Sequence, residues 1–269
     1  MDVKQLEQKR LACLMLYFVG LLLEGAGVFA MREKRIPGII LCCLGIVLWI
    51  VGNLWAKRRY QNACGKARVL HGLGMPDAKF YDKKEAASLG FPAQKLVPGG
   101  RVADPPMFLF TAQGTLRGQK ATVTEMTQAY HDEGDTKRKY LVGTLVRLPA
   151  AKCKAERMIL CGKAYGGSLR AEDFAPMRVL ETPGHAFHAL SGDGEPLEKG
   201  QTAALDVFCQ NEERSAVFLQ EKGFVDVFLP MRFFSGTYAM REKMTEELLD
   251  QDPLPELDDA LKVLSALAK

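Results

Sequence analysis

The sequence lacks the short motifs that identify the commonest enzyme classes. It contains no G-x-S-x-G nucleophile elbow, no phosphate-binding P-loop and no glycine fingerprint for a dinucleotide. The pair Gly72-x-Gly74 precedes Met75 and Pro76 rather than the start of a helix. We therefore expect no bound cofactor, and a non-enzymatic role is favoured over a catalytic one.

Patterns of metal ligands are also missing. The chain has 7 cysteines, none in a C-x-x-C pair, and Cys153 and Cys161 lie too far apart for a zinc knuckle. His185-x-x-His188 falls in or beside a predicted strand, where a spacing of three places the rings on opposite faces. The sequence therefore predicts no metal site. Scattered cysteines without a framework suit a reducing cytosol.

A strong bias toward charge of one sign is absent as well. There are 36 Lys and Arg residues against 32 Asp and Glu, which gives a net charge of +4. This balance does not favour a nucleic acid as a partner, because such partners select a large basic excess.

Two long apolar runs dominate what the sequence does contain. Leu11 to Met31 carries a single charge, Glu24, and Pro37 to Ala56 carries none. Helices of this length extend roughly 30 Å, the thickness of a bilayer's hydrocarbon core. The turn between the runs is so short that only an antiparallel arrangement fits. We predict a transmembrane helical hairpin over residues 1–56, with spans at about 11–31 and 37–56.

Two other interpretations of the apolar runs stay open. The runs could be buried helices of a soluble protein, although neither has a polar face. Alternatively, Lys9, Arg10 and the segment Val28-Phe29-Ala30 resemble a signal peptide and its cleavage site. Cleavage there would leave only a few residues before the second run.

Small residues recur at intervals of seven along both runs. They are Cys13, Gly20 and Gly27 in the first, and Gly38, Gly45 and Gly52 in the second. This spacing places each trio on one helix face. Because lipid supplies no hydrophobic force between helices, close approach through small residues holds them together. We predict that the two faces pack against each other; chance is the alternative, since glycine is common in membrane helices.

Glu24 is the costly residue of the hairpin. A carboxylate deep in a membrane span costs about 3 kcal/mol on insertion scales, and such residues often mark ion or proton pathways. Glu24 is therefore a candidate functional residue. The alternative is a structural one, in which Glu24 is protonated or reaches toward the outer headgroups and Arg32.

Basic residues flank the hairpin mainly on one side. Three precede the first run and five follow the second, against three in the turn. By the positive-inside rule this count places both termini in the cytoplasm and the protein in the inner membrane. Lys57, Arg58 and Arg59 are candidates for contact with anionic lipid. The topology signal alone explains these residues equally well.

The remainder of the chain changes from helical to alternating periodicity. Glycine and proline are frequent between residues 57 and 104, which predicts a juxtamembrane linker. From Met107 onward the pattern alternates with period two, and helical patterns return near the C-terminus. We predict a cytosolic α+β domain over residues 105–269, built from a mainly antiparallel β-sheet with C-terminal helices.

Glu125 is the most notable acid of this domain. It lies between Gly118 and Gly143 on neighbouring predicted strands, and glycine permits close approach of a ligand or another backbone. It is a candidate functional residue, although we favour the alternative of an exposed acid on a strand.

Several sequence features follow one another along the chain in an order that resembles that of a known family. After the hairpin come Gly114-x-x-x-Gly118 with Glu125, then Gly143-Thr-Leu-Val-Arg-Leu, Phe187-x-x-x-Ser191-Gly-Asp193 and a hairpin ending in Val227-Phe-Leu-Pro230. This pattern resembles the bacterial membrane proteins of the domain of unknown function 3137 family. The resemblance implies a two-span membrane protein with a shared soluble domain. It implies no activity and no catalytic residue.

Two functions follow from these observations. The first is a binding or scaffolding module at the inner face of the membrane, with an unidentified protein partner and the lipid bilayer as its contacts. The second is a membrane-bound enzyme that acts on lipid or peptide. A pocket that brings together Glu125, His131 or His188 would favour the enzyme, and an exposed flat or apolar face would favour binding.

Overall fold

The computed structural model describes residues 2–97, 102–131, 137–162, 177–182, 184–211, 214–233, 243–252 and 254–269. The chain divides into two compact units. The helical unit comprises residues 1–72 and 235–251, and the sheet unit comprises residues 73–234 and 252–269.

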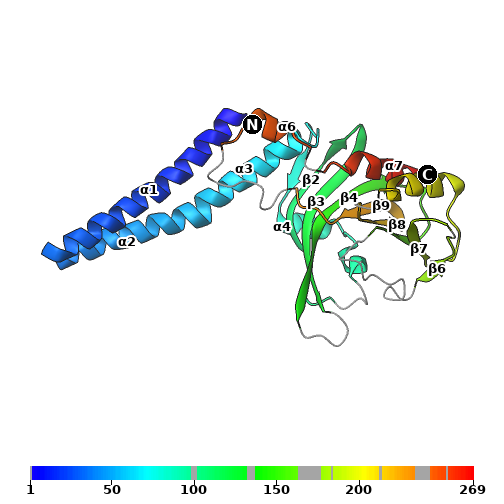
Figure 1. Cartoon of the computed structure of the whole chain (residues 1–269), viewed down its shortest axis with the longest axis horizontal. Helices are drawn as coiled ribbons and strands as arrows, with labels where there is room; N and C mark the ends of the chain where they lie inside the picture. Colours follow the sequence, from blue (N-terminus) through cyan, green and yellow to red (C-terminus); the bar gives the residue numbers. More distant parts are fainter. Residues whose placement is uncertain are drawn as a thin grey trace. The chain divides into compact units, whose positions relative to one another are not determined.

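The helical unit is built on an antiparallel pair of long helices (Figure 1). Helix α1 (Val3–Glu33) is followed by α2 (Arg35–Val51), a π-helical turn (Gly52–Ala56) and α3 (Lys57–Leu70). The chain reverses at Lys34, which has an extended backbone. Both Val3–Glu33 and Arg35–Leu70 are long and apolar enough to cross a membrane.

The surface of this pair is apolar. Large hydrophobic side chains are exposed along both helices, among them Leu11, Met15, Phe18, Leu21, Leu22, Phe29, Ile36, Ile39, Ile40, Val47, Trp49 and Leu54. A water-soluble protein rarely exposes so continuous an apolar surface. The packing thus disfavours the interpretation of the two runs as buried core helices.

Residues expected to form a linker belong instead to ordered elements of both units. Helix α3 follows the π-helical turn directly, and its buried residues Tyr60, Ala63, Cys64 and Ala67 recur at helical spacing. They pack with Leu6 and with residues near the short helix α6 (Glu246–Asp250). The glycines and prolines that suggested a linker become frequent only from Gly72 onward, so they do not interrupt this helix.

A polar interaction also stabilises the contact between α1, α3 and α6. The Glu7 carboxylate accepts a hydrogen bond from the backbone N–H of Met244 at 2.5 Å and pairs with Arg10 at 2.8 Å. Nearby, burial raises the pKa of the Cys64 thiol to about 11. Cys64 is therefore a packing residue rather than a reactive thiol.

The sheet unit contains one nine-stranded antiparallel sheet, in the order β1-β2-β3-β4-β9-β8-β5-β7-β6. The strands are β1 (Lys79–Tyr81), β2 (Met107–Leu116), β3 (Gln119–His131), β4 (Arg138–Ala150), β5 (Arg157–Cys161), β6 (Arg178–Leu180), β7 (Phe187–Ser191), β8 (Ala216–Glu221) and β9 (Gly223–Leu229). This layout confirms the predicted α+β class, with an antiparallel sheet and C-terminal helices.

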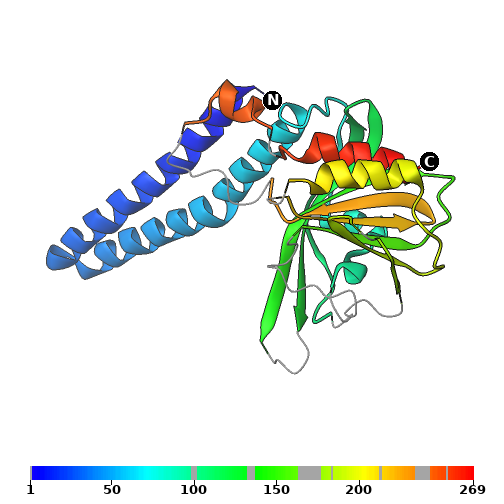
Figure 2. The same cartoon turned by 45° about the vertical axis from the view of Figure 1, so that its right-hand side comes forward.

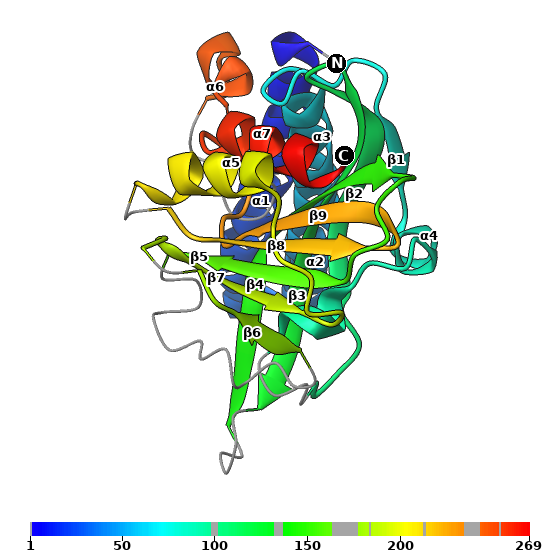
Figure 3. The ribbon, with the colours of Figure 1, turned by 90° about the vertical axis from the view of Figure 1, so that its right-hand side faces the viewer.

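Two layers cover the sheet. Helices α5 (Lys199–Cys209) and α7 (Leu257–Leu267) lie side by side over one face (Figures 2 and 3). The amphipathic α7 is fixed there by Gln220, whose side-chain amide donates to the Leu267 carbonyl at 2.8 Å.

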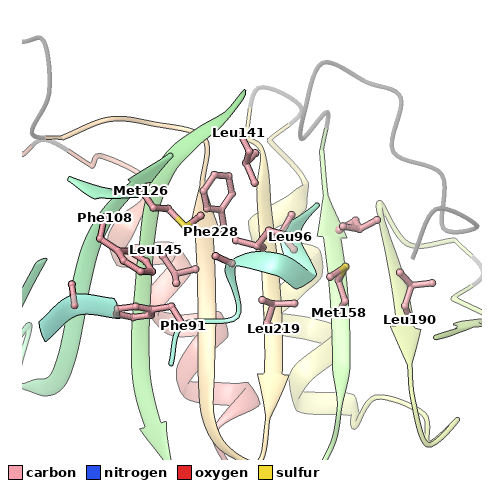
Figure 4. Close-up of a cluster of buried hydrophobic side chains, with 14 residues drawn as sticks. Phe91, Leu96, Phe108, Met126, Leu141, Leu145, Met158, Leu190, Leu219 and Phe228 are labelled. Atoms are coloured by element: carbon pink, nitrogen blue, oxygen red, sulfur yellow. The ribbon is translucent and has the colours of Figure 1, made fainter. Parts of the chain in front are cut away.

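The opposite face is covered by residues that precede β2. Helix α4 (Lys83–Ser88) begins with a capping box in which Asp82 and Glu85 satisfy each other's backbone N–H groups. A 3-10 turn (Ala93–Leu96) follows. Phe91 and Leu96 belong to the same buried cluster as Met126, Leu145 and Phe228 (Figure 4). This part of the predicted linker therefore forms core.

A disulfide joins strand β5 to the end of α5. It links Cys161 and Cys209, whose Cα atoms lie 5.7 Å apart, across 48 residues of sequence. The sequence did not predict this pairing, because the two residues meet only once the sheet and its helix have assembled. Disulfides are typical of oxidising compartments. The cysteine argument for a reducing cytosol therefore no longer supports the topology, which rests on the basic residues alone.

Candidate functional sites

The structure places all six small residues of the two runs in the contact between the long helices. A Cβ added to Gly20 would lie 3.0 Å from the Gly45 carbonyl oxygen, and one added to Gly27 would lie 2.8 Å from that of Gly38. The Cys13 thiol donates to the Gly52 carbonyl at 3.5 Å. Next to this point the Tyr17 hydroxyl donates to the Asn53 side chain, a polar contact of the kind that holds membrane helices together.

Glu24 lies at the edge of this contact. It is partly exposed, and a Cβ added to Gly45 would lie 2.6 Å from its Cγ atom. Within the described residues no basic side chain forms an ion pair with Glu24. The geometry gives Glu24 a position beside the helix contact, but it shows no chain of polar groups leading to or from it in the described part.

Glu125 is fully buried on β3, so the interpretation as an exposed strand acid is wrong. It pairs in register with Phe110 of β2 and Thr144 of β4. The flanking glycines serve other purposes. Gly118 has φ of 81° in the β2–β3 turn. A Cβ on Gly143 would lie 2.5 Å from the Phe228 ring. The close approach at Gly143 is thus made by the chain itself.

A buried ion pair lies at the centre of the sheet. Arg147 on β4 and Asp226 on β9 are paired in register, and two hydrogen bonds of 2.7 and 3.0 Å join guanidinium and carboxylate. Arg147 lies between the rings of Phe91 and Phe224, with its Cζ 4.8 and 4.6 Å from their centroids. Both charged side chains are almost completely excluded from water.

Arg147 also binds the segment between α4 and the 3-10 turn, which covers one face of the sheet. Its Nη1 donates to the carbonyls of Leu89 and Gly90 at 3.0 and 3.2 Å. Burial raises the pKa of Asp226 to about 6, and the Arg147 guanidinium opposes that rise. Since every strong donor of Arg147 is directed at the protein itself, we assign this pair a structural role.

A pocket of about 360 Å³ lies near the start of α5. It is lined by Leu180, Glu181, Thr182, His185, Pro196, Leu197 and Thr202. His185 Nδ1 lies 2.7 Å from Asp206 Oδ1, and its ring stacks on Phe187 with centroids 5.3 Å apart. This orientation commits Nδ1 to the carboxylate and leaves Nε2 as the ring nitrogen available to a ligand.

The hydroxyl groups of this pocket are used by the backbone. Thr182 donates to the Phe187 carbonyl at 3.2 Å, and Thr202 donates to the Glu198 carbonyl at 3.1 Å. Neither hydroxyl is hydrogen-bonded to His185 in the described part of the chain. Among its described lining residues, the pocket thus combines an oriented imidazole with no activated nucleophile.

A pocket that brings together Glu125, His131 or His188 was the arrangement that would favour an enzyme. His188 is exposed on β7, and the pocket contains His185 but not His188, His131 or Glu125. Among the described residues, no group of three or more His, Cys, Asp or Glu side chains could hold a metal ion.

The sequence patterns were not used to predict the Arg147–Asp226 and His185–Asp206 pairs, although the first pair is indicated by its position in two apolar strands. Arg147 and Asp226 each interrupt an otherwise apolar strand, within Thr144-Leu-Val-Arg147-Leu and Val225-Asp-Val-Phe228. Two opposite charges at the centres of buried strands predict a buried ion pair. His185 and Asp206 lie in a loop and a helix, and nothing in their spacing indicates that they meet.

An exposed surface runs along the arm formed by the outer ends of β3 and β4 (Figure 1). Strand β9 pairs with β4 only from Thr144 onward, so residues 138–141 of β4 pair with β3 alone in the described part. Tyr140 is 59% exposed, and Met107, which is 51% exposed, lies on the same face. Thr127 of β3 pairs with both Met107 and Val142, so the partly exposed Val142 lies on this face as well. We call Met107, Tyr140 and Val142 the arm surface.

No family model, curated protein or solved structure matches this chain. The resemblance to the domain of unknown function 3137 family therefore stays a prediction.

Proposed function

We propose that the protein is anchored in the inner membrane by α1 and α2, and that its sheet unit binds a protein partner at the cytoplasmic face. The arm surface is the observation that carries the binding role. The anchor is supported by two helices long and apolar enough to cross a bilayer, with large hydrophobic side chains exposed along them. The cytoplasmic location is supported by the excess of basic residues beside the outer ends of the hairpin.

The arm has the features of a recognition surface. Its β4 edge offers backbone groups to a strand of a partner, a common mode of peptide recognition. Tyr140 adds a rigid, amphipathic ring, and tyrosine is among the residues that contribute most to binding at protein interfaces. The exposed apolar face, and an edge of β4 that pairs with β3 alone in the described part, favour a protein partner over a small ligand.

Site-specific photo-cross-linking tests this assignment in intact cells. A photoreactive residue replaces Tyr140 in the full-length protein, and a matched variant carries it at Val207, an exposed apolar position of α5. We expect one discrete cross-linked protein from position 140 and none of the same mass from position 207. Identical products from both positions would show contact by collision and contradict the proposal.

A second function, an enzyme acting on lipid or peptide, is favoured by one observation. The His185–Asp206 pair could act as a general base toward water bound in the pocket. Purified full-length protein would be incubated with phospholipid and peptide substrates, next to a His185→Gln variant. Hydrolysis that disappears in the variant would support the enzyme, and equal rates in both proteins would exclude this site.

A further inference from the structure

The helix that leaves the apolar hairpin carries an exposed basic and aromatic stripe. Its members recur at intervals of three and four residues, which places them on one helix face. They are Trp55, Arg58, Arg59, Asn62 and Lys66, all exposed. The opposite face of the same helix, with Tyr60, is buried. The stripe is therefore the outward side of α3 where it continues from the apolar surface.

The stripe begins where the apolar surface of the hairpin ends. Cys13 contacts Gly52, so in an antiparallel pair the polar residues before Leu11 lie at about the level of Trp55 and Lys57. A bilayer that covers the apolar surface would then have its phosphate layer at this level. Trp55 suits that position, because its amphipathic ring is favoured at the membrane–water interface.

Two guanidinium groups at this level are available to an anion. Arg59 lies over the Trp55 ring with its Cζ 3.9 Å from the centroid. Stacking uses the face of the guanidinium and leaves its N–H edges free to donate. Within the described residues, neither Arg58 nor Arg59 forms an ion pair with an acidic side chain.

Several other arginines of the molecule are paired with acidic side chains. Arg10, at a similar level on α1, is paired with Glu7 at 2.8 Å. In the sheet unit, Arg147, Arg117 and Arg214 are all paired with aspartates. The contrast identifies Arg58 and Arg59 as basic groups at the end of the apolar surface that have no acidic counterpart in the described chain.

We propose that Trp55, Arg58 and Arg59 bind the phosphate of an anionic phospholipid in the cytoplasmic leaflet. This inference rests on the proposed membrane anchor. The guanidinium groups bind the phosphate and neutralise the headgroup's net negative charge, and the exposed apolar side chains Leu54 and Val51 contact the acyl chains. A zwitterionic lipid keeps its own positive charge close to the phosphate and is bound less well.

The test uses full-length protein in detergent with an equal mixture of phosphatidylglycerol and phosphatidylcholine. Native mass spectrometry counts the lipids retained on each protein molecule. We expect wild-type protein to retain phosphatidylglycerol preferentially. The double substitution Arg58→Gln and Arg59→Gln should lower that preference by on the order of ten-fold. Both side chains are exposed, so folding should be unaffected.

A matched control removes the same charge at the other end of the hairpin. Arg32→Gln with Arg35→Gln should leave the phosphatidylglycerol preference unchanged. A preference that survives in the Arg58/Arg59 variant, or that falls equally in the control, overturns the inference. Inorganic phosphate at matched ionic strength is a third arm. Displacement of the lipid by phosphate would show simple anion binding and would also overturn it.

Failure of the anchor is measured separately. Cell membranes containing the wild-type protein are washed with alkaline carbonate, which releases peripheral proteins. Release would contradict the proposed anchor itself. Retention in the membrane without a lipid preference in the spectrometer would overturn only the lipid site.

Discussion

The two units of this protein differ in where their large hydrophobic side chains lie. In the helical unit the contact between α1 and α2 is made by glycine and cysteine, while most large hydrophobic residues along these two helices are exposed. In the sheet unit the large hydrophobic residues are inside, and the buried charges of Arg147 and Asp226 are paired. The difference indicates that one unit is organised by close backbone packing and the other by removal of apolar surface from water.

The largest effect is expected from cutting the chain inside the sheet unit. A fragment of residues 104–269 lacks Phe91, Leu96 and strand β1, which belong to the core and the sheet. Each large buried side chain contributes about 1.5–3 kcal/mol. We expect this fragment to be insoluble or to unfold without cooperativity, whereas residues 73–269 should unfold cooperatively in urea. Equal stability of the two fragments would show that residues 73–103 are dispensable.

Removing one partner of the buried ion pair should have the next largest effect. Asp226→Ala leaves the Arg147 guanidinium buried without its carboxylate, which costs roughly 3–5 kcal/mol. Asp258→Ala removes an exposed carboxylate that pairs with Arg117 and should cost about 0–1 kcal/mol. Urea unfolding of the full-length protein, followed by circular dichroism of the sheet, measures both. Similar losses would mean that the central pair is effectively solvated.

In the helical unit the sensitive positions should be glycines rather than large side chains. Gly45→Leu introduces a side chain whose Cβ would lie 2.7 Å from the Gly20 carbonyl oxygen. Overpacking of this kind costs about 1–3 kcal/mol. Val47→Leu and Leu22→Ala alter exposed positions and should change stability little. Thermal unfolding of the detergent-solubilised protein distinguishes them, and equal tolerance at all three would make the seven-residue spacing a coincidence.

The free energy of unfolding should also depend on pH. The pKa of Asp226 is about 6 in the folded protein, because burial disfavours its charged form, against roughly 3.9 in an unfolded chain. Between about pH 4 and 6 the folded state therefore holds a proton that the unfolded state has lost. This group makes the free energy of unfolding fall as pH rises through that window, with no further change above it.

Asp226→Asn is the matched variant for this measurement. It cannot titrate, so its free energy of unfolding should fall less between pH 4 and 6 than that of the wild-type protein. The slope is compared rather than the absolute stability, since the variant also loses the charge that faces Arg147. Parallel curves for the two proteins would contradict the raised pKa.

The sequence by itself determined the features that depend on local periodicity. The seven-residue spacing of small residues, the two apolar runs and the alternation from Met107 onward are readable because each lies within one helix or strand. Their consequences are the antiparallel pair of long helices and the antiparallel sheet. Glycine and proline were a weaker guide, because Phe91 and Leu96 pack into the core from a segment rich in both.

Only the tertiary structure decided which distant residues meet. Arg147 and Asp226 are separated by 79 residues, and Cys161 and Cys209 by 48. His185 meets Asp206 across a loop and a helix, and Glu125 is buried although its neighbours in sequence allowed an exposed position. Such contacts depend on strand order and on the layers that cover each face, and these follow from long-range packing rather than from any local pattern.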